Sequence, residues 1–279
     1  FCGWIGDIGD VAASDDTAGG PVELAVLGYP FTRYEEDEHA NIAEIAALMA
    51  RAGARPASFA CGGLPWASSV PKGQAVLAFP YGWPAAARLA ECTGCCAVSV
   101  DYPIGTTGVA RFLSAVEQAS SRPARPHPGD ERLVRETRRV RSLFPGFKAA
   151  IFADPALALA LGSFVSDLGG QLVVASCTGD IPEHLAGRVP EAWLRSPSRL
   201  DVRDAVATGG VDLIVGSSVE YVDLRDLGIP FLELGFPSYY RHALVPAPYL
   251  GLAGSLRLVG EVYTLLARRW NIMEDPYRC

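Results

Sequence analysis

Lysine is nearly absent from this sequence. Of the 24 basic residues among 279, only Lys72 and Lys148 are lysine, and the others are arginine. Arginine carries a permanent charge on a planar donor fork, which favours ion pairs of fixed geometry. The net charge is -7, so the chain has no general attraction to nucleic acid or to an anionic membrane. We expect neither as a partner.

Long hydrophobic runs and phosphate-binding glycine loops are also missing. The longest apolar run, near residues 156–165, is well short of the roughly 20 residues that a membrane span needs. No G-x-G-x-x-G follows a predicted strand, and no P-loop is present, so we expect no dinucleotide or ATP site within the chain. The hydrophobic fraction of 49% excludes a disordered chain.

The cysteine content and the first residues bear on location and completeness. Seven cysteines in a chain without an N-x-[S/T] acceptor argue against a secreted disulfide framework and predict a reducing, cytoplasmic setting. The chain begins at Phe1 without an initiator Met. We therefore expect a fragment with further residues before Phe1, and we interpret residues 1–19 as an N-terminal remnant or linker.

Apolar runs of strand type alternate with helical periodicities along the chain. Strands are predicted over residues 22–27, 75–79, 97–100, 148–153, 171–175, 211–215 and 231–234. Helices are predicted over residues 39–52, 85–91, 109–119, 130–143, 155–168 and 254–267. This βαβ alternation favours mostly parallel sheets covered on both faces.

The two halves of the chain repeat one pattern. Each first strand is followed by a proline within three residues, at Pro30 and Pro155, and Gly94–Pro103 and Gly228–Pro237 share a nine-residue spacing. We predict an α/β fold of two Rossmann-like three-layer domains that face a cleft. The predicted domains span residues 20–120 and 145–279, joined by a linker and charged helix over residues 121–144.

Candidate site residues lie where predicted parallel strands end, because ligands of open α/β sheets bind there. Cys61 and Cys177 follow two strands, and Tyr239, Arg241 and His242 follow the last one. Each has a structural alternative, such as packing or a hydrogen bond that anchors its loop. If Arg241 is buried, we expect it to meet an acid, a carbonyl group or an anionic ligand.

Cys92-x-x-Cys95-Cys96 invites a metal or redox interpretation. No second Cys/His pair lies at the spacing of a zinc site. We expect these three residues to be small buried side chains rather than ligands. Asp154 and Glu220 also follow predicted strands, where acidic residues commonly cap the next helix.

Residues 210–266 carry a composite motif that resembles the C-terminal domain of the nitrogenase component 1 family. Its parts are Asp212-Leu213, Gly216, Leu227-Gly228-Ile229-Pro230, Gly235-Phe236-Pro237, Arg241, Pro248-Tyr249-x-Gly251 and Gly254. Pro103-Ile104-Gly105 with Phe112-Leu113 is similar to a segment of its β-type subunits. The resemblance extends over about residues 20–270.

The resemblance implies subunits of three Rossmann-like domains, of which this chain would hold the second and third. An iron–sulfur cluster in the full complex would have its cysteine ligands outside this segment. In catalytic α subunits a Cys and a His hold a metal cofactor, whereas the nearest positions here, 79–81 and 235–236, supply neither. A molybdenum–iron-type cofactor or its precursor would then lie on the partner subunit.

Three functional hypotheses follow. The first is a β-type subunit of a nitrogenase or nitrogenase-like reductase, which pairs with a homologous α-type chain in an α2β2-like assembly. It would receive electrons from an ATP-hydrolysing iron–sulfur reductase. The second is a non-catalytic scaffold subunit for assembly of the metal cofactor. The third, outside the family, is a two-domain carrier or transferase.

Overall fold

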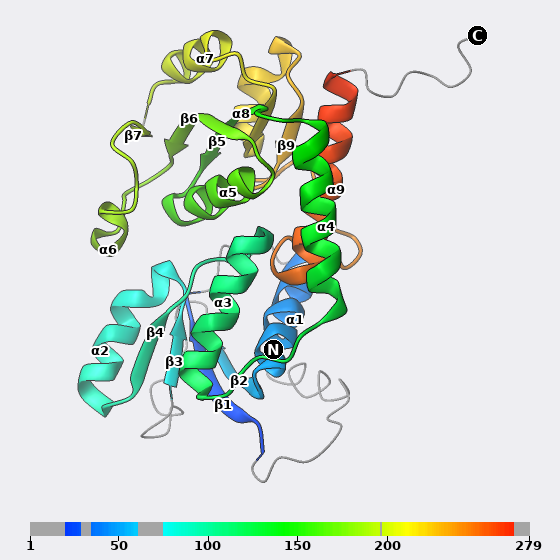
Figure 1. Ribbon diagram of the computed structural model, residues 1–279. Helices are drawn as coiled ribbons and strands as arrows, with labels where there is room; N and C mark the ends of the chain where they lie inside the picture. Colours follow the sequence, from blue (N-terminus) through cyan, green and yellow to red (C-terminus); the bar gives the residue numbers. More distant parts are fainter. Residues whose placement is uncertain (1–19, 29–34, 61–74, 196, 271–279) are drawn as a thin grey trace.

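The computed structural model describes residues 20–28, 35–60, 75–195 and 197–270. Within them lie two sheets whose strand pairs are all parallel, in two units that Figure 1 shows one above the other. The first sheet has the order β2-β1-β3-β4, and the second β7-β6-β5-β8-β9. The strands are β1 (Val22–Leu27), β2 (Ala54–Ala60), β3 (Ala75–Ala78), β4 (Cys96–Ser99), β5 (Lys148–Ala153), β6 (Gln171–Cys177), β7 (Leu194–Arg195), β8 (Leu213–Gly216) and β9 (Phe231–Glu233).

Helices cover both faces of the first sheet. Because successive side chains of a strand point to opposite faces, Leu24 and Val26 of β1 join one buried cluster while Ala25 and Leu27 join another. The first face packs against α1 (Glu36–Arg51) and α3 (Gly105–Ser120), and the second against α2 (Trp83–Thr93). The near-continuous apolar run of β1 therefore reflects burial on both sides.

The second sheet is covered in the same way. Ile151 of β5 faces the cluster that contains α5 (Pro155–Asp167), and Phe152 faces α7 (Arg199–Thr208) and α8 (Ser218–Leu224). The short helix α6 (Glu183–Ala186) follows β6, and the short 3-10 helices are η2 (Pro80–Gly82) and η3 (Arg225–Leu227). The α/β prediction with two Rossmann-like units is confirmed.

The repeat seen in the sequence has a structural counterpart. Strands β2-β1-β3-β4 match β6-β5-β8-β9 in order and direction. Pro103 follows β4 and Pro237 follows β9, the corresponding edge strands. The boundaries predicted for the two domains remain a prediction.

Two long helices run along one side of both units. α4 (Pro128–Leu143) and α9 (Gly251–Arg269) pack against each other, and α9 also contacts α1 and α3 of the first unit (Figure 1). One hydrophobic cluster accordingly contains side chains from both sheets, from Leu24 to Ala267. Among the described helices, none combines the length and the apolar character that crossing a membrane requires.

Several elements differ from the prediction. The helices predicted over 39–52 and 254–267 begin three residues earlier, at Glu36 and Gly251. For β2 only the strand end before Cys61 was expected, without a range, and strand β7 and helices α6, α7 and α8 were not predicted as elements. β2 (ARPASFA) mixes polar and apolar residues and contains a proline, which lowers its strand signal. A proline is tolerated because β2 lies at the edge of its sheet, where a missing N–H costs little.

The burial expected of the CxxCC cysteines holds for one of the three. Cys95 is buried, whereas Cys92 and Cys96 are exposed, so the expectation was wrong for these two. Cys92 lies in the last turn of α2, and Cys96 opens the edge strand β4. An edge strand has a neighbour on one side only, which leaves the side chain of Cys96 less covered, and the end of α2 leaves that of Cys92 open to solvent.

Two glycines of α9 provide a matched stability test. A Cβ at Gly254 would lie 2.8 Å from the Cα of Tyr249, whereas a Cβ at Gly260 meets nothing within 4 Å. We expect Gly254→Ala to lower the free energy of unfolding by about 1–3 kcal/mol because the helix start must shift. Gly260→Ala should raise it by about 0.5–1 kcal/mol through helix propensity. Chemical denaturation of both variants measures this, and equal effects would contradict the close approach.

Candidate functional site

The segment between β9 and α9 (234–250) is tied to the first turns of α1. The amide of Ala243 donates to Oε2 of Glu35 at 2.7 Å, and the amide of Glu36 donates to the carbonyl of Ala243 at 3.1 Å. Nδ1 of His242 lies 2.9 Å from Oε1 of the same Glu35. This segment follows a strand of the second sheet but is held by a helix of the first.

The end of the same segment is fixed by side-chain acceptors of α1. Oδ1 of Asn41 accepts from the amides of Tyr249 and Leu250 at 2.8 and 2.9 Å, and Oε2 of Glu44 accepts from Ala253 at 2.9 Å. Asn41 is fully buried. These bonds satisfy amides at the start of α9, which have no intrahelical partner.

The beginning of the segment is anchored at Glu233. Its Oε1 accepts from the hydroxyls of Ser218 and Ser238 at 2.6 and 2.7 Å and from the amide of Tyr240 at 3.4 Å. Burial alone would raise the pKa of this carboxyl, but these donors outweigh it and hold the pKa below its usual value. Gly235 has φ 138°, a backbone conformation that glycine alone adopts readily.

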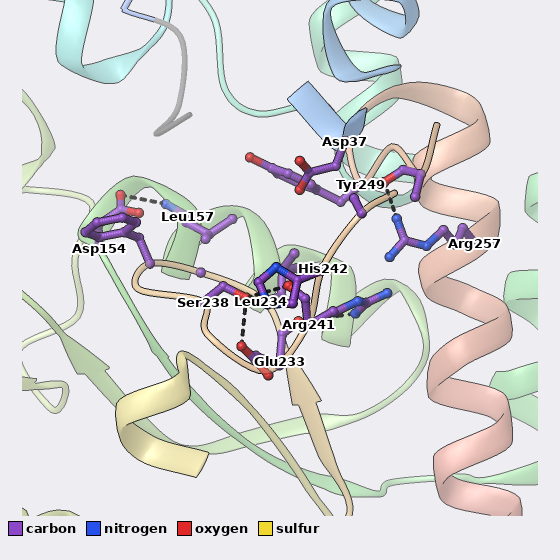
Figure 2. Close-up of a pocket in the computed structure, with 14 residues that line it drawn as sticks. Asp37, Asp154, Leu157, Glu233, Leu234, Ser238, Arg241, His242, Tyr249 and Arg257 are labelled. Carbon is purple, nitrogen blue, oxygen red and sulfur yellow. Dashed lines mark hydrogen bonds between the residues drawn. The ribbon is translucent and has the colours of Figure 1, made fainter. Parts of the chain in front are cut away.

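A cavity of about 260 Å³ lies where this segment meets α1, α5 and α9 (Figure 2). It lies beyond the carboxyl ends of β5 and β9, the position predicted for a ligand of an open α/β sheet. Its lining residues are Asp37, Asp154, Leu157, Glu233, Leu234, Gly235, Phe236, Ser238, Arg241, His242, Ala243, Ala247, Tyr249 and Arg257.

Two guanidinium groups share one carboxylate on the α9 side of the cavity. Nη2 of Arg241 donates to Oε1 of Glu261 at 2.5 Å, and Nε of Arg257 donates to the same oxygen at 2.9 Å. Nη1 of Arg241 also donates to the carbonyl of Glu233 at 3.2 Å. The expectation that Arg241 meets an acid or a carbonyl group is confirmed. Burial lowers the pKa of Arg257, although Glu261 opposes that effect.

Asp154 lies on the other side of the cavity (Figure 2). It caps α5, as the sequence suggested, through bonds from the amides of Ala156 and Leu157 at 3.0 and 3.1 Å. The hydroxyl of Tyr81, from the first unit, donates to the same Oδ1 at 2.6 Å. Burial raises the pKa of Asp154 and also that of Tyr81, so the phenol stays protonated. A carboxyl with a perturbed pKa in a cavity is a candidate functional group.

The structure separates the predicted site residues. Arg241 and His242 line the cavity. Tyr239 does not and is 67% exposed, while Cys177 is buried at the end of β6. Cys61 lies outside the described residues. Sequence reasoning named neither Arg257 nor Asp37, and it considered Asp154 only as a cap.

The donor set of the cavity does not suit an iron–sulfur cluster. Such clusters are held by cysteine thiolates, and none of the described residues that line the cavity is a cysteine. Across the part of the chain that the structure describes, no group of three or more His, Cys, Asp or Glu side chains could hold a metal ion. The described lining therefore offers polar and charged groups but no thiolate for a cluster.

The environments of the cysteines predict different reactivities. Burial and the nearby Asp154 carboxylate raise the pKa of the Cys177 thiol from 9.0 to about 11. Because the thiolate is the nucleophile, this shift alone lowers its reactive fraction about 100-fold at neutral pH. We expect iodoacetamide to modify Cys177 at least that much more slowly than the exposed Cys92 and Cys96 in native protein, as measured by peptide mass spectrometry. Equal rates in the native protein would contradict the buried placement, and unfolded protein provides the control.

Known proteins with similar sequences and folds include nitrogenase chains. A molybdenum-iron protein beta chain of Methanococcus maripaludis is 27% identical over 187 residues, which cover 63% of this chain and 40% of that protein. A molybdenum-iron protein beta chain of Acidithiobacillus ferridurans is 29% identical over 175 residues, which cover 58% of this chain and 34% of that protein. The chain thus aligns with well under half the length of these relatives. The solved structure of nitrogenase Cp1 at pH 6.5 has the same fold, with a TM-score of 0.73, 18% identity and coverage of 98% of this chain and 66% of that one.

The model of one family matches nearly the whole chain. It is that of the nitrogenase component 1 type oxidoreductases, and the match extends over residues 11–267. The matched range contains both sheets, the cavity and nearly all of α9. On this match over most of its length, the chain belongs to the nitrogenase component 1 type oxidoreductase family.

Proposed function

We propose that this chain is the β-type subunit of a nitrogenase or nitrogenase-like reductase. In this proposal it pairs in the cytoplasm with a homologous α-type chain, and a separate ATP-hydrolysing iron–sulfur protein supplies the electrons. The observation that carries the proposal is the family match over residues 11–267 together with relatives that are beta chains. Family membership removes the carrier or transferase hypothesis, which lay outside the family.

The cavity supports a β-type over an α-type assignment. The resemblance implies that α-type subunits hold their cofactor through a Cys after a second-domain strand and a His after the last strand. Here the corresponding positions are 79–81 and 235–236, and they supply no thiol or imidazole. The nearest imidazole, that of His242, pairs with Glu35. We therefore propose that any metal cofactor lies on the partner subunit.

An exposed aromatic surface next to the cavity suits subunit pairing. Phe236, Tyr239 and Tyr240 are 58%, 67% and 59% exposed. Solvent-exposed aromatic side chains are enriched where proteins meet. The amide of Tyr239 is fixed by the hydroxyl of Ser218 at 2.5 Å, so the surface is held in place before a partner arrives. We propose that this surface, Phe236–Tyr240, contacts the α-type subunit.

Anaerobic co-purification tests the function. The protein is produced together with a homologous α-type subunit from the same organism, and iron, molybdenum and vanadium are measured in the purified complex. We expect a stoichiometric complex that contains iron and reduces a substrate only when the iron–sulfur reductase and ATP are supplied. A complex with bound metal but no turnover would favour the scaffold alternative. Failure of the two subunits to associate would overturn both.

The pairing surface can be tested with variants that leave the fold intact. Tyr239→Ala should change the free energy of unfolding by less than about 0.5 kcal/mol, since the side chain is exposed. Arg241→Ala should cost about 1 kcal/mol, because Glu261 keeps Arg257 as its partner. Both should weaken pairing with the homologous subunit at least about tenfold. Leu200→Ala, equally exposed at 72% but on α7, is the control.

Calorimetric melting and quantitative co-purification separate the two roles of Arg241. If Arg241 only stabilises its own segment, the melting temperature of Arg241→Ala falls while the folded variant pairs normally with the homologous subunit. That result, together with normal pairing of Tyr239→Ala, would remove the Phe236–Tyr240 surface from the interface.

A further inference from the structure

The cavity has an unused hydrogen-bond donor at one end. In Arg257, Nε is taken by Glu261, and Nη1 donates to the carbonyl oxygens of Ala247 and Pro248, the latter at 2.9 Å. Nη2 has no hydrogen-bond partner among the described residues. Figure 2 shows Arg257 reaching from α9 into the cavity. Because a guanidinium has five donors and no acceptor, this free nitrogen suits a carboxylate or another oxyanion.

An unused acceptor lies at the other end. The three hydrogen bonds to Asp154, from Tyr81, Ala156 and Leu157, all reach Oδ1. No hydrogen bond from another described residue reaches Oδ2, although the carboxyl lines the cavity and is partly buried. Figure 2 places Asp154 across the cavity from Arg257. A partly buried carboxylate with an oxygen open to the cavity suits an ammonium or another cationic nitrogen.

Other charged groups adjoin the two atoms. On the α9 side, two guanidinium groups, Arg241 and Arg257, share the carboxylate of Glu261, and the Asp37 carboxylate also acts on the pKa of Arg257 in the upward direction. Around Asp154, the neighbouring Tyr81 and Cys177 are kept neutral by raised pKa values. Glu233 accepts its three hydrogen bonds through Oε1. The free donor of Arg257 and the free acceptor of Asp154 therefore lie on different sides of one polar cavity.

From these two unpartnered atoms at opposite ends of one cavity, we propose that the cavity binds a small zwitterion, an amino carboxylate. Its carboxylate pairs with Nη2 of Arg257, and its ammonium group pairs with Oδ2 of Asp154. The ligand joins the N-cap residue of α5 to a side chain of α9, and Tyr81 of the first unit orients the carboxyl that receives it. The inference rests on the cavity alone and does not depend on electron transfer or on the α-type partner.

A series of ω-amino acids tests the proposal by isothermal titration calorimetry on the purified protein. The series runs from glycine through β-alanine and γ-aminobutyrate to longer homologues, with butyrate and butylamine as probes that carry one charged end. We expect one chain length to bind best and to exceed both single-ended probes at least about tenfold, since each charged end contributes its own hydrogen bond. Absence of binding throughout the series would overturn the proposal.

Two variants, each of which removes one charge, test which residue binds which end of the ligand. Asp154→Asn keeps an oxygen for the amides of α5, and it should weaken binding of the best amino acid about 10- to 100-fold while leaving the affinity for butyrate unchanged. Arg257→Gln should weaken binding of the amino acid and of butyrate but not of butylamine. Asp226→Asn removes a carboxylate that pairs with Arg203 on the surface and should change nothing.

The Asp154 variant decides by itself if Arg257→Gln does not fold. Equal loss of amino acid and butyrate binding in Asp154→Asn would show that the carboxyl supports the cavity rather than the ammonium group. Unchanged amino acid binding in Asp154→Asn would overturn the assignment as well. Failure of the co-purification experiment would leave these titrations unaffected, so the two proposals fail separately.

Discussion

The rest of the structure depends on the hydrogen bonds that side chains of α1 and its N-cap accept from backbone amides between β9 and the first turn of α9. Glu35, Asn41 and Glu44 take four amides of the segment that joins β9 to α9 and of the start of α9. The amide of Leu250 is buried among them, and a buried amide without a partner costs about 1–3 kcal/mol. The second unit therefore satisfies this buried amide only when the first unit is beside it. The amide of Gly251 completes the contact by donating to the carbonyl of Pro103 at 2.8 Å.

The placement of α9 follows from that constraint. Once its first turn is fixed on α1, its apolar side chains pack among those of α1, α3 and α4 in one cluster. Gly254 allows the close approach, because a side chain there would collide with Tyr249. The same orientation carries Arg257 to the cavity, with Glu261 one turn further along α9 as its partner. The packing of the last helix and the chemistry of the cavity are thus consequences of one docking arrangement.

The local sequence pattern predicted those strands and helices whose formation depends on residues close together in the chain. Buried parallel strands such as Val22–Leu27 and Lys148–Ala153 are apolar on both faces, and prolines mark helix starts, so these elements could be predicted. Arg241 and His242 could be named because they follow the last strand. Arg257 could not, because its i, i+4 pairing with Glu261 is typical of any solvated helix. The role of Asp154 depends on Tyr81, 73 residues away, and no local pattern contains such a contact.

One short segment contributes to two surfaces. Phe236, Tyr239 and Tyr240 are exposed, while Arg241 turns inward to Glu261, which also holds Arg257. The segment between them is anchored, because Arg241 donates to the carbonyl of Glu233 and the amide of Tyr239 donates to the hydroxyl of Ser218. The surface proposed for subunit pairing and one wall of the cavity therefore depend on the same few hydrogen bonds.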